Sequence, residues 1–203
     1  MTNHGLFKPL VMFFGLCNSL ATFQTMMNDV LQSFIDRNVV ICYMDDILVF
    51  TETLEEHRKV VRDILLTLQQ HMLFLKPEKC LFKRSSVNYL GLMISRGCVS
   101  MDPVKVHGVS DWPHPKKVKE VQSFLGFVNF YCWFIKYFAK IAHPLHALTH
   151  KKCNWSWGES EDTAFNKLKS AVTLAPTLAF PSDHRPFQLE CDTSNFATGA
   201  MLS

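Results

Sequence analysis

The chain has little net charge, no C-x-x-C pair of cysteines and no long apolar run. Its formal net charge is +3 over 203 residues, and charged residues make up 19% of the sequence. A disordered tail needs more charge than this, and any nucleic-acid partner has to be held by local basic patches. No apolar stretch approaches the roughly 18 residues that cross a membrane, and no leading signal peptide is present. We therefore expect an intracellular protein of the cytoplasm or nucleus, not secreted and without a membrane partner.

Cysteine and histidine are present but are not spaced as metal ligands. The seven cysteines are Cys17, Cys42, Cys80, Cys98, Cys132, Cys153 and Cys191. None belongs to a C-x-x-C pair, and an odd number is unsuited to a disulfide framework. Among the nine histidines, His143 and His146 stand three residues apart with no third ligand near them in sequence. These patterns argue against a zinc site and favour reduced thiols.

Hydrophobic residues make up 48% of the chain, enough for one large domain or two small ones. Apolar residues at three- and four-residue spacing predict helices over 19–37 and 54–71. Asn18 or Ser19 can cap the first helix, and Thr53 begins a capping-box signature before the second. The other predicted elements are a β-rich stretch around 87–94, a short helix capped by Asp102 with Pro103 at its first position, a mostly helical segment over 117–148, a helix over 160–174 and a strand over 187–192.

Two adjacent carboxylates, Asp45 and Asp46, lie between two short apolar runs. Residues 39–42 and 47–50 have the length and composition of strands, and the tight polar tip between them predicts a β-hairpin. Adjacent acids repel each other unless a cation binds them or solvent screens them. Mg²⁺ is the usual ion for hard oxygen ligands, especially where phosphates complete its coordination shell. The alternative is a turn that merely separates two strands, because Asp is common in turns.

An ordered series of short motifs surrounds this hairpin. In chain order they are FGLCNS at 14–19, ATFQ at 21–24, YMDD at 43–46, LEEH at 54–57, LKPEKC at 75–80, YLG at 89–91 and QSFLGF at 122–127. Tyr-x-Asp-Asp on a hairpin resembles the catalytic motif of reverse transcriptases. The whole series is similar to the polyproteins of long-terminal-repeat retrotransposons of the Ty3/gypsy class, and the similarity runs from about residue 5 to residue 203.

The resemblance implies an α+β fold in three parts. Residues 1–100 correspond to the C-terminal part of the reverse-transcriptase palm, and 101–154 to a helical thumb or connection region. Residues 155–203 correspond to the start of a truncated RNase H-like α/β domain. The implied partners are an RNA or DNA template–primer and dNTPs, whereas the resemblance assigns no oligomeric state.

The resemblance also implies a two-metal active site. In the family, polymerisation uses two Mg²⁺ ions held by three carboxylates. Asp45 and Asp46 match two of the three, and Tyr43 and Met44 match positions beside the primer terminus and the incoming nucleotide. The third carboxylate is expected on a strand upstream of residue 1. We therefore expect that these 203 residues alone do not synthesise DNA.

Two further groups of residues match family positions near the substrates. Phe14 and Gly15 match a segment that lines the nucleotide pocket, and Gln24 lies on the helix behind it. Packing alone would also account for Phe14. Residues 89–91, which are Tyr89, Leu90 and Gly91, match the hairpin that grips the primer strand. A glycine there permits close approach of the backbone to nucleic acid, and the alternative is an ordinary strand-end glycine.

Asp192 ends an apolar strand and resembles the first catalytic carboxylate of RNase H, which also acts through two metals. The other acids of that site are expected beyond residue 203, so Asp192 alone is not expected to cut RNA. Thr193 and Asn195 depart from the residues usual in the family. Such departures leave open a second interpretation, in which the chain is a non-catalytic, nucleic-acid-binding relic of a decayed element.

Lysines and aromatic residues alternate over 116–140, a composition that suits a nucleic-acid surface. The aromatics fall largely at helical spacing, which favours core positions for most of them. The resembled family usually has two arginines where this chain has Cys132 and Trp133. Their loss is expected to weaken any phosphate contact made by this segment.

Overall fold

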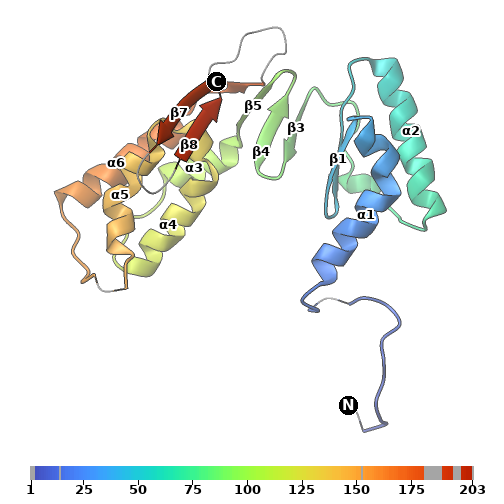
Figure 1. Ribbon diagram of the computed structural model, residues 1–203, viewed down its shortest axis with the longest axis horizontal. Helices are drawn as coiled ribbons and strands as arrows, with labels where there is room; N and C mark the ends of the chain where they lie inside the picture. Colours follow the sequence, from blue (N-terminus) through green and yellow to red (C-terminus); the bar gives the residue numbers. More distant parts are fainter. Residues whose placement is uncertain (1–2, 14, 152, 181–188, 194–197, 203) are drawn as a thin grey trace. The chain divides into compact units, whose positions relative to one another are not determined.

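The computed structural model describes residues 3–13, 15–151, 153–180, 189–193 and 198–202 (Figure 1). The chain forms two compact units, Met1–Phe82 and Lys83–Ser203, each with its own hydrophobic core. Helices and small antiparallel sheets occur in both units, which confirms the predicted α+β class. Within the described part of the chain, no helix is long and apolar enough to span a bilayer.

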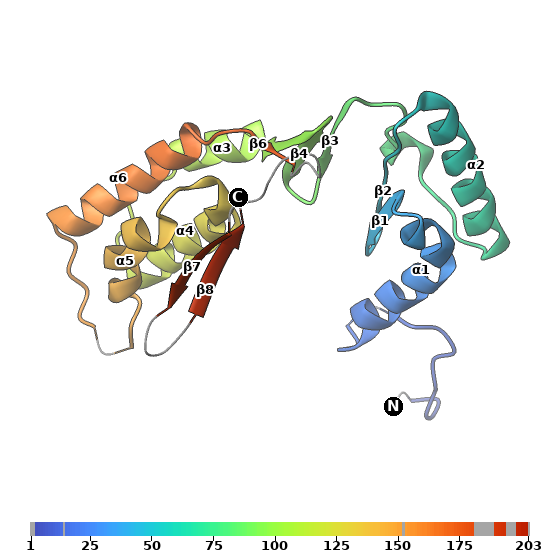
Figure 2. The same cartoon turned by 45° about the horizontal axis from the view of Figure 1, so that its top comes forward.

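The first unit is a β-hairpin packed against two helices. Helix α1 (Ser19–Asp36) precedes strands β1 (Val40–Tyr43) and β2 (Asp46–Val49), and helix α2 (Leu54–Gln70) follows. Both helices contact each other and the hairpin (Figure 2). A single 3₁₀ turn, η1 (Pro77–Lys79), lies near the end of the unit. The predicted hairpin and both predicted helices are thus confirmed.

The core of this unit comes from apolar residues of both helices and the hairpin, and the spacing predicted it only in part, since Leu54 and Leu65 of α2 are exposed whereas Val60 is buried. Its buried members are Met27, Leu31, Phe34, Val39, Val40, Val60, Ile64 and Leu68. Helix α2 begins as predicted, because the Thr53 hydroxyl accepts a hydrogen bond from the Glu56 N–H at 3.3 Å. The predicted side-chain cap of α1 is wrong. Asn18 makes no capping bond, and the Ser19 hydroxyl instead donates to the Phe13 carbonyl oxygen at 3.2 Å.

The second unit begins with an antiparallel sheet in the order β3-β4-β5-β6. Strands β3 (Ser86–Tyr89), β4 (Leu92–Ser95) and β5 (Cys98–Met101) follow one another along the chain. Strand β6 (Leu178–Ala179) comes much later in the chain, after the helices of the unit. It pairs with β5 through Cys98↔Ala179 and Val99↔Leu178.

Helices fill the chain between β5 and β6. They are α3 (Pro103–Ser110), α4 (Val118–Phe130), the 3₁₀ turn η2 (Cys132–Phe134), α5 (Phe138–Leu148) and α6 (Glu159–Thr173). Asp102 caps α3 as predicted, since its Oδ1 accepts from the Val104 N–H at 2.9 Å. One core joins these helices, with Phe124, Leu145 and Leu168 among its fully buried side chains.

The last described strands, β7 (Leu189–Thr193) and β8 (Thr198–Leu202), form an antiparallel pair. The two compact units divide after Phe82, whereas the predicted parts divide after residues 100 and 154. Those predicted parts follow resemblance to family segments rather than compactness, and they stay predictions.

Candidate active site

The two predicted catalytic carboxylates lie at the tip of the β1–β2 hairpin. The register pairs Cys42 with Ile47 and Tyr43 with Asp46, so that Met44 and Asp45 form a two-residue loop. Loops of this length twist correctly only when the first central residue has a positive φ. Met44 has φ 52°, a conformation that costs a residue with a side chain about 1–2 kcal/mol. The acids therefore lie on a tight turn with backbone strain.

The two faces of the hairpin differ in environment. Alternation along the strands turns Val40, Cys42 and Ile47 toward the helices, where they join the core. The opposite face includes Ile41 and Tyr43, which remain 48% and 52% exposed. Asp46 pairs with Tyr43 on that open face, and both Asp45 and Asp46 are exposed. A substrate or ion can therefore reach the carboxylates without displacing the core.

Gln24 on α1 holds the backbone of the turn from the core side. Its Oε1 accepts from the Met44 N–H at 2.6 Å, and its Nε2 donates to the Cys42 carbonyl oxygen at 3.0 Å. The same Nε2 donates to Asn28 Oδ1 at 2.7 Å. The amide of Gln24 therefore binds the residues on either side of Tyr43 and holds the Met44 conformation in place.

The negative charge of the turn affects the pKa of the nearby Cys42 thiol. Burial first, and then the charge of Asp46, raise the pKa of the Cys42 thiol above its ordinary value. The thiol stays protonated at neutral pH and lies 3.7 Å from the Met44 carbonyl oxygen, to which it is a weak donor. Cys42 thus supports the turn as a weak hydrogen-bond donor.

Asp45 and Asp46 supply the oxygen donors that Mg²⁺ prefers, and Mg²⁺ is commonly bound by one or two carboxylates together with water and substrate phosphates. Their exposure on a tight turn fits such an ion. Within the residues that the structure describes, no group of three or more His, Cys, Asp or Glu side chains gathers at one place. Asp45 and Asp46 therefore stay predicted members of the expected three-carboxylate set.

The predicted nucleotide-pocket residues ahead of α1 are only partly described. Phe14 lies outside the described residues. Gly15 is exposed with φ 101°, and a side chain added there would meet no other atom within 4 Å. Its glycine is therefore explained by the backbone conformation.

The predicted primer-grip residues form the turn of the β3–β4 hairpin. Tyr89 pairs with Leu92, and Leu90 and Gly91 are the two loop residues, with φ 50° and 81°. Positive φ at both positions is the requirement of a type I′ turn, which explains the glycine. Leu90 is 40% exposed at this tip.

The predicted RNase H-type carboxylate, Asp192, lies in β7 and pairs with Gly199 of β8. The prediction that most aromatics of 116–140 lie in the core holds only in part, because Tyr131 and Phe134 are buried but Tyr137 is exposed. Phe124 is fully buried, whereas Phe130 and Trp133 are 53% and 85% exposed.

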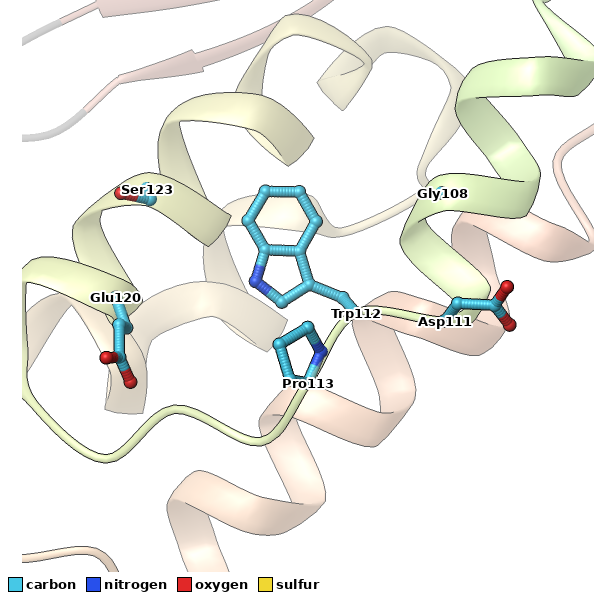
Figure 3. Close-up of a pocket in the computed structure, with 6 residues that line it drawn as sticks. All are labelled: Gly108, Asp111, Trp112, Pro113, Glu120 and Ser123. Atoms are coloured by element: carbon cyan, nitrogen blue, oxygen red, sulfur yellow. The ribbon is translucent and has the colours of Figure 1, made fainter.

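A shallow pocket also occurs where α3 ends and α4 begins (Figure 3). Trp112 and Pro113 form its wall, with Glu120 and Ser123 on α4 beside them. None of the predicted site residues lines it, so the pocket is separate from the candidate active site.

Two family models match the chain. Residues 1–94 match the family model described as reverse transcriptase (RNA-dependent DNA polymerase). Residues 157–203 match the model described as the RNase H-like domain found in reverse transcriptase.

The curated relatives of this chain are polyproteins of transposons. The chain is 37% identical to the retrovirus-related Pol polyprotein from transposon opus of Drosophila melanogaster, over 100% of this chain and 21% of that protein. It is 35% identical to the transposon Tf2-3 polyprotein of Schizosaccharomyces pombe, over 98% of this chain and 15% of that protein. The chain therefore spans about a fifth or less of these relatives.

Two solved structures resemble the fold. The foamy viral protease-reverse transcriptase in complex with dsDNA has a TM-score of 0.78 and 25% identity, covering 95% of this chain and 40% of that one. The same viral protein in complex with RNA/DNA hybrid has a TM-score of 0.76 and 26% identity, covering 90% and 25%.

Fold, motif and matched models together define a polymerase segment of the reverse-transcriptase type. The chain belongs to the reverse transcriptases of retrotransposon Pol polyproteins, as the sequence motifs predicted, and is a fragment in length relative to those polyproteins.

Proposed function

We propose that this chain provides the catalytic turn of an RNA-directed DNA polymerase, which adds dNTPs to a primer on an RNA or DNA template. The observation that carries the proposal is the Asp45–Asp46 pair, exposed on a turn whose backbone Gln24 fixes. A polymerase has to hold its metal-binding carboxylates still while substrates change, and a short hairpin fixed from behind does this.

Asp45 and Asp46 would hold two Mg²⁺ ions together with a further carboxylate. When bound, such ions lower the pKa of the primer hydroxyl and neutralise charge on the leaving pyrophosphate. Tyr43 shares the open face of the hairpin with Asp46, which supports its place beside the primer terminus. Met44, next in the turn, would lie beside the incoming nucleotide.

The remaining predicted site residues have other proposed roles. Phe14 and Gly15 would line the nucleotide pocket, and Gln24 would shape it through its bonds to the turn. The β3–β4 turn of Tyr89, Leu90 and Gly91 would contact the primer strand. Asp192 would be one metal ligand of an RNase H site completed by other acids.

Nucleic acid is the proposed partner because the similar foamy viral protein was solved with it, once with dsDNA and once with RNA/DNA hybrid. We place the protein in the cytoplasm or nucleus, where its free cysteines would stay reduced.

A second candidate function is nucleic-acid binding without turnover. It is favoured by departures from the resembled family, since this chain has Cys132 and Trp133 where two arginines are usual. Under this alternative the fold and the duplex-binding surfaces remain, but the two-metal site is never completed.

A segment exchange separates the two functions. The matching part of the Tf2-3 polyprotein would be replaced by this chain, and the folded chimaera assayed for magnesium-dependent primer extension. We expect extension that disappears in the Asp45→Asn, Asp46→Asn double variant and persists in Asp29→Asn, which removes an exposed acid on α1. A folded chimaera that binds duplex but never extends a primer would favour the second function.

A further inference from the structure

The β3–β4 turn is held from behind by one buried side chain, much as Gln24 holds the catalytic turn. The Tyr131 hydroxyl donates to the Gly91 carbonyl oxygen at 3.1 Å, across 40 residues of sequence. Tyr131 follows directly after α4 and is only 3% exposed. Its hydroxyl is therefore presented to the turn by the core of the unit.

Neighbouring rings fix the orientation of the phenol. Phe130 meets the Tyr131 ring edge-on at 4.9 Å, Phe127 lies at 5.7 Å and Phe134 at 6.4 Å between ring centroids. A side chain added at Gly91 would come within 3.6 Å of both Phe130 and the Tyr131 hydroxyl. The turn thus lies directly against this aromatic cluster.

A second bond holds the strand that leads into the turn. Asn88 Nδ2 donates to Asp102 Oδ2 at 2.6 Å, and Asp102 is itself buried while it caps α3. Burial first, and then the charge of Asp102, raise the pKa of the Tyr131 phenol. The phenol therefore stays a hydrogen-bond donor over the whole physiological pH range.

We propose that Tyr131 is a positioning residue for primer binding, because it fixes the β3–β4 turn through the Gly91 carbonyl. The proposal rests on the function above, in which Tyr89, Leu90 and Gly91 contact the primer strand. Leu90, with positive φ in a residue that disfavours it, needs an external restraint of this kind. Without the hydroxyl the same turn would sample other conformations and lose affinity for the duplex.

The test uses the full chain and the variant Tyr131→Phe, which keeps the ring and its packing. Backbone hydrogen exchange is measured over 89–93, and affinity for a primer–template duplex by fluorescence anisotropy. Losing one such hydrogen bond corresponds to a factor of about five in a local equilibrium. We expect exchange in the turn to accelerate about fivefold, and duplex affinity to fall by a similar factor, while the thermal midpoint falls by only a few degrees.

Thr149→Val is the matched control, because it removes a hydroxyl-to-carbonyl bond of 2.7 Å at the exposed end of α5. It should leave both readouts at parent values. Unchanged exchange over 89–93 in Tyr131→Phe would overturn the proposal, as would faster exchange with unaltered affinity. If the parent chain bound no duplex, the proposed function would fail, whereas the exchange data would still report whether Tyr131 restrains the turn.

Discussion

Replacing Gln24 by Met tests how the catalytic turn is held. Methionine keeps the length of the side chain and removes its amide, so that the Met44 N–H and the Cys42 carbonyl oxygen lose their partner. Both bonds are part-buried, and water can reach the freed groups only in part. The variant should destabilise the hairpin tip and leave the packing of the core residues unchanged.

The size of the effect follows from those two bonds. Each is worth about 0.5–1.5 kcal/mol net, and a buried group left unpaired costs about 1–3 kcal/mol. Taking the lower part of both ranges gives about 2 kcal/mol for opening of the turn. That free energy corresponds to roughly 30-fold faster local hydrogen exchange.

The assay is hydrogen exchange over peptides covering 40–50, because all four tryptophans lie in the Lys83–Ser203 unit and their fluorescence does not report on this hairpin. Gln32→Met is the control, since Gln32 lies on the same helix and donates to the exposed Asp36 carboxylate at 2.6 Å, away from the hairpin turn. Adding Met44→Gly to Gln24→Met should restore part of the loss by relieving the positive φ. Equal exchange in Gln24→Met and Gln32→Met would refute this account of the turn.

Three further predictions follow from the same sites. The purified 203-residue chain should show no magnesium-dependent primer extension, because the described residues give only two of three carboxylates; extension lost in the Asp45→Asn, Asp46→Asn variant would contradict this. The chain should bind duplex weakly and without sequence preference, with affinity that falls steeply as salt rises; no anisotropy change at tens of micromolar protein in low salt, roughly the non-specific range, would rule this out. Leu90→Asn should stabilise the Lys83–Ser203 unit by about 0.5–1 kcal/mol, because Asn-Gly suits a type I′ turn; tryptophan fluorescence during urea unfolding measures it, and a lower midpoint would count against the assigned turn geometry.

Local patterns predicted the hairpin and its helices because their causes are local. The apolar runs around Asp45 and Asp46 specify strands, and the capping residues Thr53 and Asp102 work through bonds to a backbone N–H two or three residues away. The predicted cap of α1 failed because the Ser19 hydroxyl found the Phe13 carbonyl instead. A serine side chain has several backbone partners within reach, and spacing does not choose among them.

The restraints on the two turns could not be predicted in this way. Gln24 is 20 residues from Met44, and Tyr131 is 40 residues from Gly91. Neither distance has a periodic signature, because each bond depends on how whole elements pack. The sequence predicted the helix on which Gln24 lies but not its bonds to the turn. Tyr131 was predicted only as one of the aromatic residues of 116–140.

The return of β6 to the sheet limits where such a polyprotein can be divided. The match to the RNase H-like model begins at residue 157, yet α6 contributes Phe165 and Leu168 to the core shared with α4 and α5. Leu178 and Ala179 then complete the sheet that starts at Ser86. A recombination breakpoint or protease cut placed before α6 would separate helix α6 and edge strand β6 from the helical core and the sheet that they complete. Exchange of RNase H modules between related elements should therefore be tolerated only at junctions beyond Ala179.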